Sequence, residues 1–150
     1  MKPLIVLLSV FIISLLVLKM IYGVDDFPRA GRIGMAFMLV FTAMGHFIFT
    51  EGMTLMIPSP IPFKKEVVYL TAVIEIVAAV GLLIPKLVTT TGWFLIIFLL
   101  LIFMANIQAS FKYLNYETGN FNGAGPAYLW FRAPVQLLYV VWVYLSAIRF

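Results

Sequence analysis

The sequence predicts an all-α membrane protein with five transmembrane helices. Hydrophobic residues make up 64% of the chain, charged residues make up 11%, and the mean hydropathy is +1.11, far from soluble averages. The apolar residues form runs of roughly 20, the length that crosses a bilayer. Backbone amides in hydrocarbon must be hydrogen-bonded within their own segment, so these runs are predicted as helices. The predicted spans are residues 3–22, 32–50, 66–84, 90–108 and 128–148.

The first span, residues 3–22, follows Lys2 and could instead be a signal peptide. The sequence after it, "KMIYGVDDFPRAGR", lacks a small-x-small cleavage site, so we expect the segment to be retained as a helix. Its only internal polar residues are Ser9 and Ser14. The first helix is therefore predicted to pack at the edge of a bundle formed by the other four.

The second span, residues 32–50, contains the only histidine of the chain, His46, near its end. Taken alone, this histidine could be an interface residue or part of a polar site. The loop that follows contains Pro58, Pro60 and Pro62. These prolines predict an extended, polyproline-like hook at the membrane surface.

The third span, residues 66–84, carries Glu75 near its middle. A carboxylate there costs roughly 2.5 kcal/mol or more on insertion scales. The small residues Thr71, Ala72, Ala78 and Ala79 lie three or four positions away and allow another helix to approach closely. We therefore expect Glu75 to face protein and to pair with Arg132 or His46. Its role could be an interhelical bond that fixes packing, or the binding of a ligand, a proton or an ion.

The last two spans also carry polar residues. The fourth ends at Asn106 and Gln108, and a long loop rich in aromatics, Asn and Gly follows. In the fifth, Arg132, Gln136 and Tyr139 stand at i, i+4 and i+7, which predicts one polar strip along that helix.

We call the proline loop after the second span and the aromatic loop after the fourth span the two elaborate loops. Five alternating spans put both on one face, and the polar residues lie in the adjacent half of the bundle. This convergence predicts a polar layer that includes His46. The predicted ligand-binding residues are His46, Glu75, Asn106, Arg132, Gln136 and Tyr139.

Residues 29–150 resemble the DoxX-like family of small four-helix membrane proteins, while residues 1–28 form an extra helix and loop outside that pattern. The chain is expected to be one transmembrane domain. The resemblance rests on "MGHF" at 44–47, "MIPSPIP" at 56–62, "VIEIVAAVGLLIP" at 73–85, "MANI" at 104–107 and "FRAPVQ" at 131–136.

The resemblance implies a role in membrane redox processes or in resistance to oxidative, quinone or thiol stress. Our leading hypothesis is a small accessory subunit, such as the membrane subunit of a quinone-linked oxidoreductase. In it, His46, Glu75, Arg132 and Gln136 surround a headgroup-sized pocket. The alternatives are a proton-coupled exporter of lipophilic compounds that uses Glu75, and a non-catalytic assembly or scaffold subunit.

Composition limits the cofactors and partners. The chain has no cysteine and one histidine, so thiol–disulfide exchange by its own residues is excluded. We expect no intrinsic cofactor and no metal site, with quinone as the one candidate cofactor. The net charge of +4 is scattered without a basic stripe, which argues against nucleic acid. The expected partners are the lipid bilayer, a soluble redox protein and a second copy of the chain.

The protein is expected to be a multi-pass protein of the cell membrane, the bacterial inner membrane by its resemblance. Basic residues slightly favour an outside N-terminus and an inside C-terminus. The inner side would carry Lys19, Arg29, Arg32, Lys86 and Arg149, the outer side Lys2, Lys64, Lys65 and Lys112, with Arg132 at the edge of a span.

Overall fold

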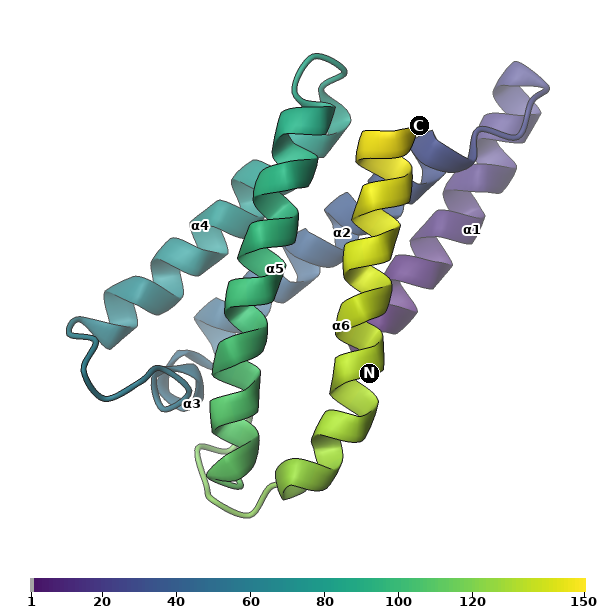
Figure 1. The fold of residues 1–150 in the computed structure, drawn as a ribbon. Coiled ribbons are helices and arrows are strands. Elements are labelled where there is room, and N and C mark those ends of the chain that lie inside the picture. The colour runs from purple at the N-terminus through teal and green to yellow at the C-terminus, as the bar shows by residue number, and fades with distance from the viewer. Residues whose placement is uncertain (1) are drawn as a thin grey trace.

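The computed structural model describes residues 2–150, which form an all-α bundle without strands (Figure 1). Five of its helical segments are long and apolar enough to cross a membrane, so the chain is a multi-pass membrane protein. The α-helices are α1 (Lys2–Tyr22), α2 (Phe27–Ile48), α3 (Thr50–Thr54), α4 (Lys64–Leu83), α5 (Val88–Phe111) and α6 (Leu129–Val143). A 3-10 turn, η1 (Gly125–Tyr128), precedes α6, and a π-helical turn, η2 (Tyr144–Arg149), continues it.

All five predicted spans are present, and their bounds differ by a few residues. The largest difference is at α2, which begins at Phe27 and not at residue 32. The Asp26 carboxylate accepts a hydrogen bond of 2.9 Å from the backbone N–H of Arg29, and Pro28 lies in the first turn. Both features favour a helix start, so the cap extends the helix beyond the apolar run. Pro134 lies inside α6 and not in its first turn, because the helix already begins at Leu129.

The helices form two layers, with α5 and α6 in front of α2 and α4 in Figure 1. Helix α1 packs along α2 at the edge of the bundle, as its lack of polar residues predicts. Gly34 makes this close approach possible, because a Cβ there would lie 3.0 Å from the carbonyl oxygen of Leu7. The indole Nε1 of Trp142 donates to the carbonyl of Gly31 at 3.0 Å and ties α6 to α2. The main core cluster is apolar, and a few polar side chains such as Glu75 and Gln136 are also buried. The outward faces are largely apolar too, as a bilayer requires.

The two elaborate loops lie on the same face, at the bottom of Figure 1, where α3 approaches the loop between α5 and η1. At Gly52 of α3, a Cβ would overlap the carbonyl of Tyr116, so only glycine allows this contact. Lys2 at the start of α1 contacts Glu117 of the same loop, with Nζ and Oε1 3.4 Å apart. The loop between α2 and α4 therefore contains a short helix, α3, ahead of the three prolines, which the prediction of an extended hook did not include.

Candidate functional site

His46 joins two membrane helices through both nitrogens of its ring. It lies in the last turn of α2, and its Nε2 is 3.3 Å from Oε2 of Glu75 on α4. Its Nδ1 is 3.1 Å from the hydroxyl oxygen of Thr71, one turn earlier on the same face of α4. The side chains of His46 and Glu75 are only 13% and 9% exposed. Glu75 is therefore turned toward protein, as predicted, and His46 is the ionisable side chain that it contacts.

The predicted polar strip of α6 lies against the same region. Gln136 and Tyr139 are buried, and the side-chain amide of Gln136 donates to the carbonyl of Leu99 on α5 at 2.7 Å. Arg132 and Glu75 line one small cavity together with Gln136 and Tyr139. Arg132 forms no ion pair with Glu75 within 4.0 Å, so their predicted pairing is replaced by shared contact with this cavity.

Two buried polar atoms at this cavity lack a hydrogen-bond partner within residues 2–150, namely Oε2 of Glu75 and Nε of Arg132. The 3.3 Å contact of Oε2 with His46 is within ion-pair distance but is not a formed hydrogen bond. Buried unpaired polar atoms are rare because they lose hydration without replacement. Both atoms are thus available to a further polar group or to water.

The cavity is smaller than the headgroup-sized pocket that the sequence suggests. Its volume is about 50 Å³, room for one or two water molecules, whereas ligand sites usually measure about 300 Å³ or more. Met38 and Phe98, with Pro3 of α1, are among the residues that line it. A ring-shaped ligand would have to displace them.

Asn106 is not brought into this cluster. Its side-chain amide donates to the carbonyl of Ile102, one turn back on α5, at 3.0 Å, and the residue does not line the cavity. A polar side chain in an apolar helix can bond to the backbone of its own helix. Its position on a predicted face is therefore a poor guide to its contacts with other helices.

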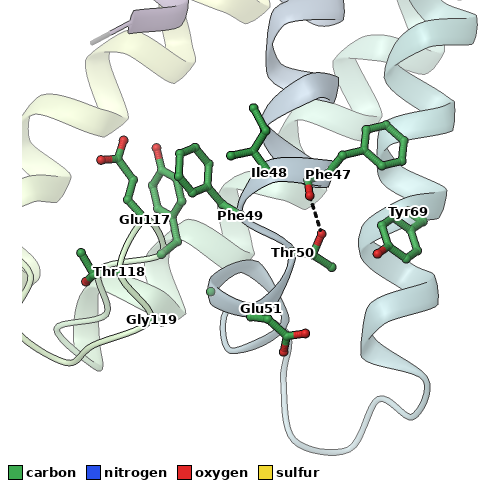
Figure 2. A pocket seen from close by; sticks show the side chains of 11 residues that line it. Phe47, Ile48, Phe49, Thr50, Glu51, Tyr69, Glu117, Thr118 and Gly119 are labelled. Carbon is green, nitrogen blue, oxygen red and sulfur yellow. Dashed lines mark hydrogen bonds between the residues drawn. The ribbon is translucent and has the colours of Figure 1, made fainter.

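A larger pocket, which the sequence pattern did not predict, lies at the loop face (Figure 2). Its volume is about 360 Å³, and it lies between the end of α2, α3, α4 and the loop at residues 116–119. The rings of Phe47 and Tyr69 stack at 5.6 Å, and those of Phe49 and Tyr116 meet edge to face at 6.0 Å. We call this the aromatic pocket. Aromatic residues are common at any membrane surface, so their presence in both loops was too weak a signal.

The aromatic pocket is also lined by two carboxylates, and each has a lysine partner. Glu51 pairs with Lys65 at 2.6 Å, and Glu117 pairs with Lys2 at 3.4 Å. Burial, followed by the nearby Glu117 carboxylate, raises the pKa of the Tyr116 phenol above its ordinary value of 10.0. The phenol therefore remains a hydrogen-bond donor at neutral pH.

The aromatic pocket adjoins the chain segment that carries His46. Phe47, the next residue, is part of its wall, and the hydroxyl of Thr50 in the same wall donates to the carbonyl of His46 at 2.7 Å. Within residues 2–150, His, Cys, Asp and Glu side chains form no group of three or more that could hold a metal ion.

Fold and site define a class: a small helical membrane protein with an ionisable pair buried between its spans. The chain belongs to the family described as a domain of unknown function, DUF8561, whose match covers residues 35–147. That match begins inside α2 and leaves α1 outside. No curated protein and no solved structure matches the chain.

Proposed function

We propose that this protein is a small membrane subunit that binds a quinone or another lipophilic redox-active molecule, with an accessory role in redox chemistry or stress resistance. The observation that carries the proposal is the aromatic pocket beside the segment that holds the buried His46–Glu75 pair. A pocket of ligand size with several aromatic walls suits a flat ring. The resemblance to the DoxX-like family adds support from the sequence.

The proposal gives the two regions different tasks. The ring lies in the aromatic pocket, where the phenols of Tyr69 and Tyr116 line the wall and can donate to a carbonyl. His46 and Glu75 supply or accept the proton that accompanies a change in the redox state of the ring. Electrons come from a soluble redox partner or pass between bound molecules, since the chain has no cysteine and one histidine.

Photolabelling tests where the ring binds. The protein is reconstituted in liposomes, labelled with an azidoquinone, and digested to map the labelled residues. We expect labelling in residues 47–52 and 116–119 and at Tyr69, and several-fold less labelling in Phe47→Ala. Trp130→Ala is the matched control, because Trp130 is 87% exposed and does not line the pocket. The proposal fails if no quinone binds and if the protein, alone or with its genomic neighbours, changes no quinone turnover.

The His46–Glu75 pair also favours a second function, proton-coupled export of lipophilic compounds. A buried carboxylate with a titratable partner can bind proton and substrate in turn. Counterflow of a labelled lipophilic compound in proteoliposomes would support export, and its absence would support the quinone function. A scaffold subunit is a third candidate, favoured if substitutions at Glu75 and Arg132 lower stability but spare activity.

Location and assembly are further parts of the proposal. We infer a place in the bacterial inner membrane, with the N-terminus outside, and pairing with a second copy of the chain. Accessibility of single introduced cysteines to a membrane-impermeant reagent tests the orientation, and the chain offers a clean background because it has no cysteine.

A further inference from the structure

We propose that His46 and Glu75 together hold one exchangeable proton inside the membrane, and that Thr71 is a positioning residue that fixes which ring nitrogen takes part. Only the purpose that we assign to this proton, its supply to a bound ring, rests on the proposed function. The proton site itself follows from two contacts between α2 and α4 and one contact within α4.

The first contact settles the role of Thr71. Its hydroxyl donates to the carbonyl of Val68 at 2.7 Å, and a carbonyl can only accept. A hydroxyl has one hydrogen, so the Thr71 oxygen is left to accept from the ring nitrogen of His46, 3.1 Å away. In this arrangement the hydrogen of the contact between Thr71 and His46 is on Nδ1 of the ring.

The second step concerns the other ring nitrogen. With a hydrogen on Nδ1, a neutral imidazole presents a lone pair at Nε2, and this atom faces Oε2 of Glu75 at 3.3 Å. A lone pair and a carboxylate repel each other in a buried site. A proton between the two atoms removes the repulsion, either as an imidazolium beside a carboxylate or as an imidazole beside a carboxylic acid. In both forms the pair is neutral and has gained one proton.

The groups around the pair allow the proton to leave. Among residues 2–150, Arg132 of α6 is the only charged side chain besides Glu75 that lines the cavity. The cavity residues from α1, α2 and α5 are uncharged, and α6 also contributes the Tyr139 phenol and the Gln136 amide. When the pair releases its proton, its charge becomes −1, and the guanidinium across the cavity balances it. The proton is therefore exchangeable and not locked in place.

Nitrogen NMR of the histidine ring tests this directly, because His46 is the only histidine and its label gives one residue's signals. The protein is labelled with ¹⁵N-histidine and studied in lipid without any quinone. We expect Nδ1 to stay protonated at every pH at which the protein is folded. Nε2 should change with pH in one step, and infrared spectra should show a carboxyl change at the same pH.

Matched threonine variants separate positioning from folding. Thr71→Val should remove the preference for a hydrogen on Nδ1, and Thr71→Ser should restore it. Thr42→Val is the control, because Thr42 lines the cavity but its hydroxyl donates to the carbonyl of Leu39 within α2 at 2.9 Å. Its spectrum should match that of the wild type.

Several results would overturn the inference. They are a bare Nδ1 in the wild type, an unchanged tautomer in Thr71→Val, or an Nε2 signal that never changes with pH while the protein is folded. A failure to bind quinone would leave these results intact and would count against the proposed function alone. Loss of the pH step in Glu75→Gln, with the fold retained, is expected because the amide cannot share a proton.

Discussion

Nε2 of His46 lies 3.3 Å from Oε2 of Glu75, so the only histidine of the chain meets the acidic residue in the middle of a span. The contact joins α2 to α4, and both side chains are shielded from the bilayer. Removal of either partner leaves the other ionisable group buried without this contact. The loss should therefore be measurable as a change in stability.

A double-mutant cycle at His46 and Glu75 should show that their effects on stability are not additive. We expect a coupling free energy of about 0.5–3 kcal/mol between His46→Gln and Glu75→Gln, because each substitution removes the same contact. The free energy of unfolding is measured in mixed micelles. The cycle of Glu75 with Arg132 is the comparison, and it should give a smaller coupling because those two form no ion pair. Additive effects in the first cycle would contradict the pairing.

Gly52→Ala should disrupt the aromatic pocket, since the new methyl group overlaps the carbonyl of Tyr116. The loop at residues 116–119 must then move away from α3, and quinone labelling of this loop should fall several-fold. Gly45→Ala is the control in α2, where the nearest atom to a new Cβ is the methyl carbon of Met53 at 3.9 Å. That substitution should leave labelling unchanged and raise helix stability by up to about 1 kcal/mol. Equal labelling of both variants would place the ligand elsewhere.

Deletion of the N-terminal helix should leave a foldable bundle. Helix α1 packs mainly on α2, and lipid can cover the apolar surface that its loss exposes. Removal of residues 1–24 should be milder than removal of residues 1–28, because the longer cut takes the Asp26 cap of α2, worth about 1 kcal/mol. Size-exclusion chromatography and helical content by circular dichroism check both variants. Aggregation of the shorter deletion would show that α1 is required for folding.

The sequence predicted the spans well because a bilayer imposes one rule on length and backbone bonding, and "GWFLIIFLLLIFM" satisfies it without regard to neighbours. It also predicted the burial of Glu75, since a carboxylate at mid-span has few other options. The residue that contacts Glu75 was harder to predict. Which of His46 and Arg132 meets Glu75 depends on helix rotation and tilt, and hydropathy contains neither. Asn106 lies outside the cluster, since its amide bonds to its own helix.

The aromatic pocket escaped prediction for a different reason. It is formed by tertiary contact between α3 and a distant loop, which Gly52 alone makes possible. A single glycine in a loop is too common to signal such a contact. Of the motifs on which the resemblance rests, only "MGHF" at 44–47 includes a residue that lines this pocket, Phe47.

The Tyr116 phenol should make stability fall at alkaline pH. Its pKa is raised above 10.0 in the folded protein, so the stabilisation is fully present below 10.0 and is lost as the pH rises through the folded value. Unfolding midpoints measured from neutral pH upward should therefore decline more steeply in the wild type than in Tyr116→Phe. Tyr22→Phe, at an exposed site near the opposite end of the bundle, corrects for general alkaline effects. Parallel curves for the wild type and Tyr116→Phe would contradict the prediction.

Substitution of Gln136 should separate a structural hydrogen bond from the charge balance of the cavity. Its amide donates to the carbonyl of Leu99 at 2.7 Å, and interhelical bonds of this kind contribute about 0.6 kcal/mol on average in membranes. Gln136→Leu should therefore lower the free energy of unfolding by about that amount. Gln136→Glu should lower it more, because a carboxylate cannot donate to Leu99 and adds a second negative group beside the cavity that Glu75 lines. Both variants are unfolded in mixed micelles at neutral and at acidic pH. The difference in the free energy of unfolding between the two variants should become smaller at acidic pH, because the new carboxyl gains a proton there and can donate again. A gap that does not depend on pH would show that charge at this position is unimportant.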